Sequence, residues 1–465
     1  MDIIKYTDLK CINSKVSETI LRKMPDNEFY KLKKDVYEQQ RHKNFGKKLL
    51  RKLKNKRTPY SQNVHVPPIF IKCKIKNNVL LDYFAPEREK EWKDFKNRKS
   101  KTINISNFSF FDNPNYTLNK LIEIAKCEYK CKNSIINFHD NDLLDISPFM
   151  IWGIMVQSMF PYFEGGKMSP VVKAVLKYVK IQDFSKHTYI PDSNLVSPLI
   201  IKQKKDFGEL NFYRKNFLYS TIQDTEKELK DSINDWLHHG SCCLSELGET
   251  KVSGIVTEVL NNAERHGSKE TNQGNWVVAG VMVKHAREKY KCFLSFVNTG
   301  DTISDNILNP DDENIRKKIT SYIQRHAGKS SKISKATLAT VYAMQDTISS
   351  KKKCDEGIGK GGYGLMDTVS FLNVLGHSTI TEEKPAICII SGHSCVIFRD
   401  KYCDSSLDKP RTQYFNDENT KEKLPDSKYV FDLDNSFPGT IITTRFIIDK
   451  DAIERKRAED KKDAA

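Results

Sequence analysis

The stretch Glu258-Val-Leu-Asn-Asn262-Ala-Glu-Arg-His266-Gly267 carries a carboxylate, an amide and an imidazole at intervals of four residues. Residues at this spacing lie one above another on the same face of an α-helix, so we expect Glu258, Asn262 and His266 to form a polar stripe. An amide oxygen is a suitable ligand for Mg²⁺, and a neighbouring carboxylate can orient or deprotonate a water molecule. Taken alone, such a stripe is more often a solvated helix face than a site.

Two segments further along the chain predict strands with a polar residue and a glycine at one end. In residues 293–303, an apolar run ends at Asn298 and enters a turn that contains Gly300. In residues 437–446, a turn and the hydroxyl of Thr440 precede a second apolar run. Glycine and β-branched residues in this order are typical of a turn followed by a strand.

A glycine-rich loop lies between these two strands in the sequence. Residues 357–365 contain the Gly359, Lys360, Gly361, Gly362, Gly364 and Leu365 positions, and the helix-like residues 366–372 follow them. Glycines allow backbone N–H groups to approach an anion closely, and a helix N-terminus stabilises a phosphate group.

In their order and spacing, the four segments resemble those of the GHKL, or Bergerat-fold, ATPases. This family contains DNA gyrase, heat-shock chaperones, mismatch-repair ATPases, histidine kinases and anti-sigma serine kinases, and the resemblance covers roughly the C-terminal half of the chain. It implies an α/β sandwich that binds ATP and Mg²⁺. The nucleotide contacts that it implies fall on Asn262, His266, Asn298, Gly300, Gly359, Lys360, Gly361, Gly362, Gly364, Leu365 and Thr440.

The resemblance also implies a role for individual residues. Glu258 would activate water or another hydroxyl, Asn262 would bind Mg²⁺, and Thr440 would support a water molecule that contacts adenine. The residue that recognises the adenine amino group is usually Asp in this family, whereas this chain has Asn298. An Asn side chain can still accept a hydrogen bond through its oxygen, but it has no charge.

In the family, the ATP lid lies between the second and third motifs, which here corresponds to residues 304–356. This region predicts two helices, at residues 315–326 and 332–346, and is rich in Lys and Arg. Most of these basic side chains are expected on solvated helix faces. Lys360, inside the glycine-rich loop, is the cation that we expect to reach the γ-phosphate.

Composition limits the class of protein. A chain of 465 residues predicts two or three domains, and its 11 cysteines show no paired spacing, which favours reduced thiols over disulfides or a zinc site. The first residues lack the apolar core of a signal peptide, and the most apolar stretch, residues 148–163, is too short to span a bilayer. We therefore expect a soluble, cytoplasmic protein without a membrane contact.

The formal net charge of +16 is unevenly distributed. Residues 41–57 carry many Lys and Arg residues and no acidic residue, and basic helical patches of this kind bind nucleic-acid backbones. A lysine-rich composition that reflects an AT-rich genome is the alternative. Nucleic-acid binding by this region is therefore one of two open interpretations.

The sequence divides into a basic, mostly helical N-terminal region (1–100), an α/β segment (101–205), a helical connector (206–240), the ATPase-like region (241–450) and a disordered tail (451–465). Trp236, near the end of the connector, is expected to pack on the ATPase sheet. The α/β segment is similar to STAS domains of anti-sigma-factor antagonists, in which a strand ends in Asp-x-Ser and the serine is phosphorylated by a GHKL kinase. Here the motif is Asp145-Ile-Ser147, although Ser147 followed by Pro148 also predicts a helix N-cap.

Three functions follow from these patterns. The first is an ATP-hydrolysing switch whose lid closure acts on the N-terminal domains or on a protein partner of the STAS-like segment. The second is a protein serine kinase that acts on a STAS domain or on Ser147 itself, and the third is a nucleotide sensor without turnover. By analogy, such a switch would suit bacterial regulation or defence against phage.

Overall fold

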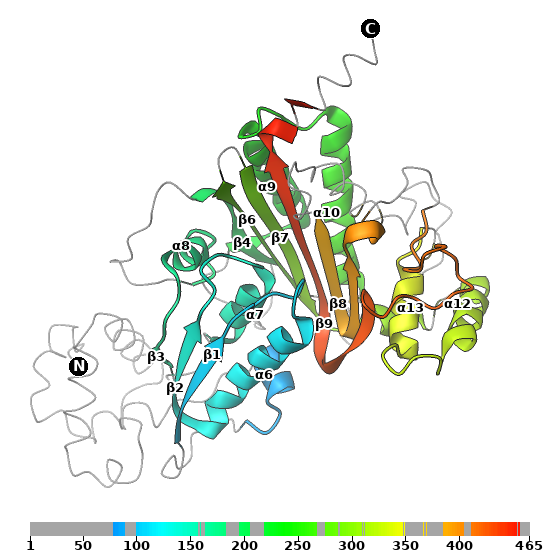
Figure 1. Ribbon diagram of the computed structural model, residues 1–465, viewed down its shortest axis with the longest axis horizontal. Coiled ribbons are helices and arrows are strands. Elements are labelled where there is room, and N and C mark those ends of the chain that lie inside the picture. The colour runs from blue at the N-terminus through cyan, green and yellow to red at the C-terminus, as the bar shows by residue number, and fades with distance from the viewer. Residues whose placement is uncertain are drawn as a thin grey trace, which may run out of the picture.

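The chain is an α/β protein, as the sequence predicts. Its two β-sheets lie on opposite sides of the helices α6 (Pro114–Lys130) and α7 (Ser147–Val156) (Figure 1). The computed structural model describes residues 78–88, 99–156, 159, 163–182, 195–204, 218–266, 275–286, 289–308, 310, 312–346, 348, 366, 369, 385–403, 411–452 and 454–455. The basic region 41–57, most of the expected tail and the glycine-rich loop lie outside these residues. None of the described helices is both long and apolar enough to cross a membrane.

The smaller sheet is parallel and has the order β1-β2-β3. Its strands are β1 (Lys99–Ile105), β2 (Cys131–Phe138) and β3 (Phe163–Gly165), and they alternate with α6 (Pro114–Lys130), α7 (Ser147–Val156) and α8 (Pro170–Tyr178). Parallel neighbours need crossover connections, which these helices supply. We call the described residues between 99 and 182 the parallel unit. Its alternation of strand and helix agrees with the α/β segment expected in residues 101–205, although the described unit ends earlier, at residue 182.

Helix α6 illustrates why these segments fold as they do. Pro114 occupies the first turn, where its missing N–H costs nothing, and Leu118, Leu121 and Ala125 recur on one buried face. A short additional helix, α5 (Val79–Phe84), begins at Asn78, whose side chain caps it.

The larger sheet has six strands in the order β5-β4-β6-β7-β9-β8. They are β4 (Leu195–Lys204), β5 (Leu218–Ser220), β6 (Asn275–Ala286), β7 (Lys289–Thr299), β8 (Ala386–Phe398) and β9 (Val430–Asp449). All neighbours are antiparallel except β4 and β5.

One expected boundary needs correction. The α/β segment was expected to extend to residue 205, but β4, which lies within it, forms its ladder with β6 of the larger sheet. Its apolar pattern predicts a strand without specifying a partner. The larger sheet therefore begins at Leu195, before the expected connector.

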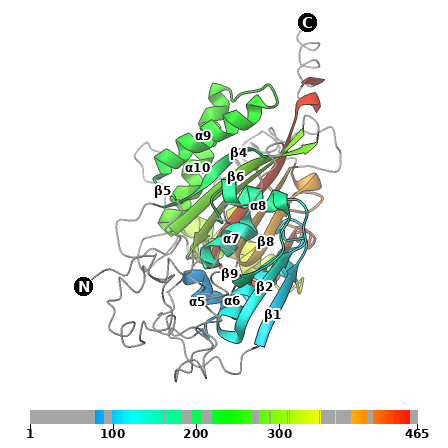
Figure 2. The same ribbon diagram turned by 90° about the vertical axis from the view of Figure 1, so that its left-hand side faces the viewer.

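Helices cover one face of the larger sheet, and the parallel unit covers the other (Figure 2). The first face packs against α9 (Ile222–His238) and α10 (Glu246–His266). In β7, Phe296 points to this side, whereas Phe293 and Val297 point to α6 and α7. Trp236 of α9 is buried and donates its indole N–H to the Ser197 carbonyl at 3.1 Å, so the expected packing of Trp236 on this sheet is confirmed.

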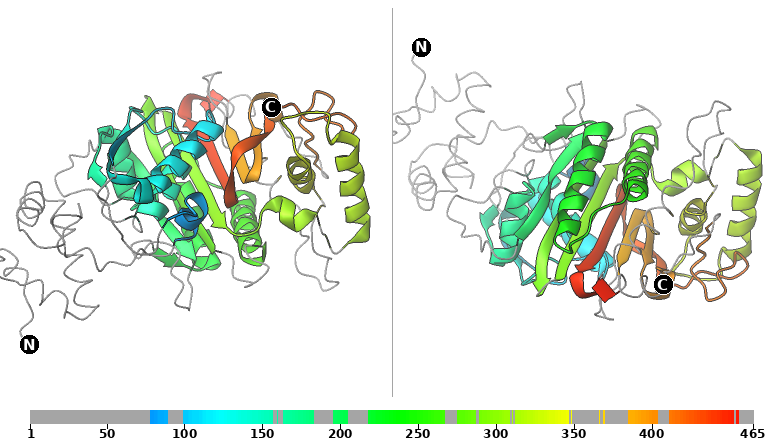
Figure 3. Two further views of the ribbon diagram at one scale, coloured as in Figure 1. Left: turned by 90° about the horizontal axis from the view of Figure 1, so that it is seen from below. Right: turned by 90° about the horizontal axis from the view of Figure 1, so that it is seen from above.

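Three helices form a lobe beside β8 and β9, with a small core of their own (Figure 3). They are α11 (Ile303–Ile307), α12 (Glu313–His326) and α13 (Lys335–Ala343), and the last two match the helices expected in residues 304–356. We call residues 303–346 the helical lobe. The chain then passes through the short 3₁₀ helix Asp400–Tyr402 between β8 and β9.

Candidate functional site

Helix α10 presents the predicted polar stripe on the side away from its buried face. Val256, Leu260 and Ala263 are buried against the larger sheet, whereas Glu258 is half-buried and Asn262 is exposed. The Asn262 amide donates to Glu258 Oε1 at 3.1 Å, as residues one turn apart can. This bond directs the amide nitrogen toward the carboxylate, so the Asn262 oxygen is the atom left to bind a cation.

His266, the third member of the predicted stripe, is the last residue of α10. The placement of its backbone supports the helical spacing. Its side chain lies outside the part of the chain that the structure describes.

The strand-end residues of the predicted site lie in one row across the larger sheet. Trp276 of β6 pairs with Asn298 of β7, Asn298 pairs with Thr440 of β9, and Thr440 pairs with Ser391 of β8. Residues directly opposite each other on neighbouring strands share a face of the sheet. Asn298 is two residues from Phe296, which packs toward α9 and α10, so the row lies on the face that these helices cover.

Contacts at both ends hold this polar row in place. The Trp276 indole N–H donates to Glu264 of α10 at 2.8 Å, which fixes the last turns of α10 over β6. At the other end, the hydroxyls of Ser391 and Thr440 are 2.8 Å apart, and the Ile303 N–H donates to Ser391 at 2.8 Å. Glu264 is therefore a structural contact of α10.

Ser391 and Trp276 belong to the row, but the motifs did not identify them. Ser391 ends an apolar run and precedes Gly392, whose φ is 62°. The same pattern of an apolar run, a polar residue and a nearby glycine singled out Asn298. That signal could have identified Ser391, whereas nothing local marks Trp276.

The close approach of β9 to β7 explains why residue 439, beside the row, is a glycine. Gly439 has a φ of 141°, and a Cβ at this position would lie 2.2 Å from the Asn298 carbonyl oxygen. The Gly300 N–H donates to the Pro438 carbonyl at 3.1 Å. Residues 437–439 were expected to form a turn before a strand, but β9 includes them. Gly439 therefore allows close packing of two strands and does not form the expected turn.

The glycine-rich loop cannot be compared with the row. Gly359, Lys360, Gly361, Gly362, Gly364 and Leu365 all lie outside the described residues. Met366 and Val369, just beyond the loop, are helical and are buried in the core that also contains α10. They lie in the helix that the sequence predicts after the loop.

The described part of the expected lid is attached to the sheet by buried polar groups. The Asp432 carboxylate of β9 accepts hydrogen bonds from the hydroxyls of Ser334, at 2.8 Å, and Thr337, both at the start of α13. Beyond the end of α13, Asp346 accepts from the backbone N–H and side chain of Arg411 at 2.8 and 3.0 Å. Removing one partner of a buried charged pair is costly, so α13 is a fixed part of the fold.

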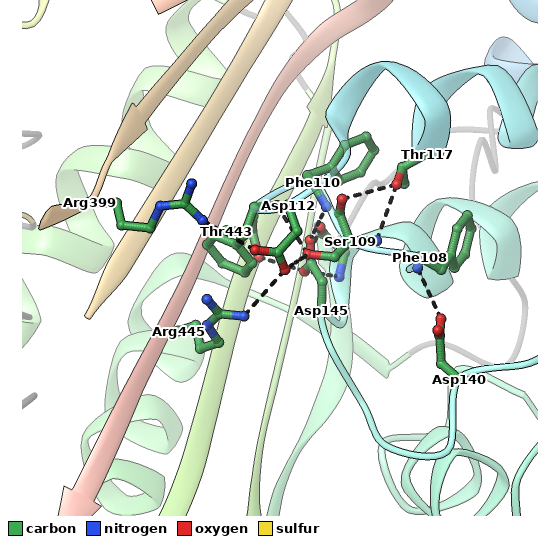
Figure 4. A network of polar contacts seen from close by, with 12 residues as sticks. Phe108, Ser109, Phe110, Asp112, Thr117, Asp140, Asp145, Arg399, Thr443 and Arg445 are labelled. Atoms are coloured by element: carbon green, nitrogen blue, oxygen red, sulfur yellow. Dashed lines mark hydrogen bonds and ion pairs between the residues drawn. The ribbon is translucent and has the colours of Figure 1, made fainter. Parts of the chain in front are cut away.

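A second polar cluster lies on the opposite face of β9, against the parallel unit (Figure 4). The fully buried Asp145 carboxylate accepts from Phe110 N–H at 3.0 Å, from the N–H and hydroxyl of Ser147 at 2.9 Å each, and from the Thr443 hydroxyl at 2.9 Å. Burial raises the pKa of the Asp145 carboxyl, while the hydrogen bonds from Ser147, Phe110 and Thr443 act in the opposite direction.

This cluster corrects the expectation that Ser147 is the N-cap of α7. The Met150 N–H donates to the Ile146 carbonyl at 3.0 Å, so the helix begins one residue earlier than a Ser147 cap would allow. Asp145 accepts the free N–H of Ser147 at this end of the helix. The Ser147 hydroxyl is completely buried, and no phosphate donor can reach it in this arrangement.

Charged groups at the edge of the same interface add to the contact. Asp112 of the parallel unit lies 3.2 Å from the Arg399 guanidinium and 3.5 Å from that of Arg445 (Figure 4). The Arg445 guanidinium also stacks on the Phe111 ring, with 4.9 Å to the centroid. The parallel unit is thus fixed to the larger sheet by apolar, hydrogen-bonded and ionic contacts.

Residues 432–435 join the helical lobe to the parallel unit. Asp432 bonds α13, while the Asp434 N–H donates to Asn115 of α6 at 2.8 Å and the Asn435 amide donates to Asn119 at 2.6 Å. A shift of α13 would therefore be transmitted to α6 through four consecutive residues.

Comparison of the chain with protein-family models, curated proteins and solved structures found no match.

Proposed function

We propose that this chain is a Mg²⁺-dependent ATP-binding protein with a Bergerat-type sandwich, and that it hydrolyses ATP as a conformational switch. The observation that carries the proposal is the register of Asn298, Thr440 and Ser391 on the sheet face that α10 covers. Helix α10 in turn carries Glu258 and Asn262. Segments far apart in the sequence thus bring Asn298, Thr440 and helix α10 to one face of the sheet, which supports the proposal.

The side chains present suit the chemistry of a Mg²⁺·ATP site. The Asn262 amide nitrogen donates a hydrogen bond to Glu258, and the free amide oxygen would hold the cation. A bound Mg²⁺ neutralises charge that develops on the phosphates. Glu258 is half-buried, and its carboxylate would orient a water molecule and accept its proton. The Asn298 amide would contact the purine, and the Thr440 hydroxyl would support a water molecule that contacts it.

The proposed switch has a physical route to the parallel unit, which we regard as STAS-like. A change at the nucleotide site would act on the helical lobe through the bond between Ile303 and Ser391, and on α6 through residues 432–435. Since α13 is held by buried groups, movement of the lobe as a body is favoured over the opening of its helices. A partner that binds the parallel unit would receive this signal.

Serine kinase activity is the second candidate, and its target would be in another molecule. Ser147 of the same chain is fully buried and donates its hydroxyl to Asp145, which disfavours phosphorylation within the chain. A sensor without turnover is the third candidate. Incubation of the purified chain with γ-labelled ATP separates the three, because labelled phosphate indicates hydrolysis, labelled protein indicates a kinase, and neither product indicates a sensor.

The binding step has its own test in Asn262→Ala. We expect Mg²⁺·ATP to raise the thermal unfolding midpoint of the parent chain, because a ligand that binds only the folded state stabilises it. The variant lacks the proposed cation ligand and should lose that rise. The exposed Asn314→Ala change in α12 is the control for removing an amide elsewhere. An equal rise in Asn262→Ala and the parent would mean that the metal site is assigned incorrectly.

A further inference from the structure

Asn298, near the end of β7, carries an amide whose orientation is not set by a hydrogen bond to a described residue. Among the described residues, none forms a side-chain hydrogen bond with Asn298. By contrast, Asn78 accepts from Leu80 and Leu81 and donates to Ile154, which fixes which atom is oxygen and which is nitrogen. Asn298 has no such constraint.

Both lateral neighbours of Asn298 already have partners. The Trp276 indole N–H is bonded to Glu264, and the Thr440 hydroxyl lies 2.8 Å from Ser391. The two hydroxyls can exchange donor and acceptor roles, so they favour neither orientation of a neighbouring amide. Asn298 is also only half-buried, which leaves its amide accessible to a ligand.

We infer that the site accepts both 6-amino and 6-oxo purine nucleotides, an inference that rests on the proposed nucleotide site. In one orientation, the Asn298 oxygen accepts from a 6-amino group and the nitrogen donates to an unprotonated purine N1. After a 180° rotation of the amide, the nitrogen donates to a 6-oxo group and the oxygen accepts from the N1–H. A carboxylate can only accept, so Asp at this position would reject the 6-oxo group.

The size of the difference follows from the cost of mismatched polar groups. A site that hydrogen-bonds a particular group can reject an analogue lacking it by about 10⁴-fold or more, because buried polar atoms are left without partners. Rotation of the amide removes this mismatch. Discrimination between the two purine classes is therefore expected to be weak in the natural chain and strong when residue 298 is Asp.

The test compares Mg²⁺·ATP with Mg²⁺·ITP, whose base has a 6-oxo group and no 2-amino group. Isothermal titration of the full chain should give dissociation constants within about tenfold of each other, because one amide serves both bases. Asn298→Asp, which keeps the size of the side chain, should weaken ITP relative to ATP by about a hundredfold or more. The control Asn314→Asp adds the same charge on exposed α12 and should leave the ratio unchanged.

The possible outcomes are distinguishable. If ATP binds and ITP binds more than about a hundredfold more weakly to the natural chain, another group reads the base and the inference is overturned. An unchanged ratio in Asn298→Asp also overturns it, because residue 298 would then not contact the 6-position. If neither nucleotide binds, the proposed function fails and the inference fails with it.

Discussion

Strand β9 carries a threonine into each of two polar clusters on opposite faces of the larger sheet. Thr443 donates to Asp145, whose carboxylate also accepts from Ser147 and Phe110 in a fully buried contact. Thr440, three residues earlier, lies beside Asn298, whose half-buried amide has no hydrogen-bond partner among the described residues. Buried polar groups are nearly always paired, so the paired cluster serves the fold and the unpaired amide is the better candidate for a ligand.

The contrast between a buried, paired cluster and a half-buried, unpaired amide also distinguishes the two groups of polar residues that the sequence suggested as functional sites. Asp145-Ile-Ser147 and the row at Asn298 both looked functional because each places a polar group next to a structured element. Packing divides them, because the first is sealed between the parallel unit and the larger sheet. The second remains at a sheet end under α10, where Glu258 and Asn262 belong to the same helix.

The largest expected effect is on turnover and concerns Glu258. Glu258→Gln keeps the amide contact with Asn262 but removes the base, so ATP hydrolysis at saturating nucleotide should fall by about 10²–10⁴-fold. Steady-state phosphate release measures the rate, and isothermal titration should show nearly unchanged ATP affinity. The matched control is Glu264→Gln, because Glu264 holds Trp276 and has no proposed role in chemistry. Full activity in Glu258→Gln would exclude it as the base.

The next effect is on stability and concerns the opposite face. Asp145→Ala leaves the N–H groups of Phe110 and Ser147 and the Thr443 hydroxyl without their acceptor, so the free energy of unfolding should fall by about 3 kcal/mol or more. Urea unfolding followed by tryptophan fluorescence measures this loss. Asp140→Ala, which removes a half-buried carboxylate from the N–H groups of Asn107 and Phe108, should cost less, about 1 kcal/mol.

The same variant changes the pH dependence of stability. Because the pKa of Asp145 is raised in the folded protein, the folded state binds a proton more tightly than the unfolded state. The contribution of this group is therefore greatest below the ordinary aspartate pKa and decreases as the pH rises through the raised value. The difference in unfolding free energy between the parent and Asp145→Ala should shrink with rising pH over that interval. A difference independent of pH would contradict the raised pKa.

Local sequence patterns predicted much of the secondary structure. The residue spacing of α10 and α12 and the apolar runs of β7 and β9 each specify one element through nearby residues. The helical stripe of Glu258 and Asn262 is local in the same sense. It could be found because the two residues are one turn apart.

The sequence did not reveal features that depend on pairing between distant segments. β4 joins β6 because of the arrangement of the whole sheet, and Ser391 meets Thr440 through the register of β8 with β9. Ser147 looked like a helix cap because its local sequence is the same whether it is exposed or buried. Its neighbour Asp145 is bonded to Thr443, 298 residues away in the chain, in the buried contact with the larger sheet.

The smallest and most direct effects come from Thr440→Val and Thr443→Val, which remove the same hydroxyl from opposite faces of one strand. Thr440→Val should weaken Mg²⁺·ATP binding by about fivefold, because a hydroxyl contributes about 1 kcal/mol, and it should also lower the free energy of unfolding by about 1 kcal/mol, because the buried bond to Ser391 is lost. Thr443→Val should lower the free energy of unfolding by about 1–2 kcal/mol and leave ATP affinity unchanged.

The measurement that tests the central claim is the ATP affinity and urea unfolding of these two variants and the parent under identical conditions. We expect both variants to lose stability, because each loses a buried hydrogen bond, and only Thr440→Val to lose ATP affinity. Equal ATP affinity in the parent and Thr440→Val, or weakened affinity only in Thr443→Val, would contradict the placement of the nucleotide site beside Asn298 and α10.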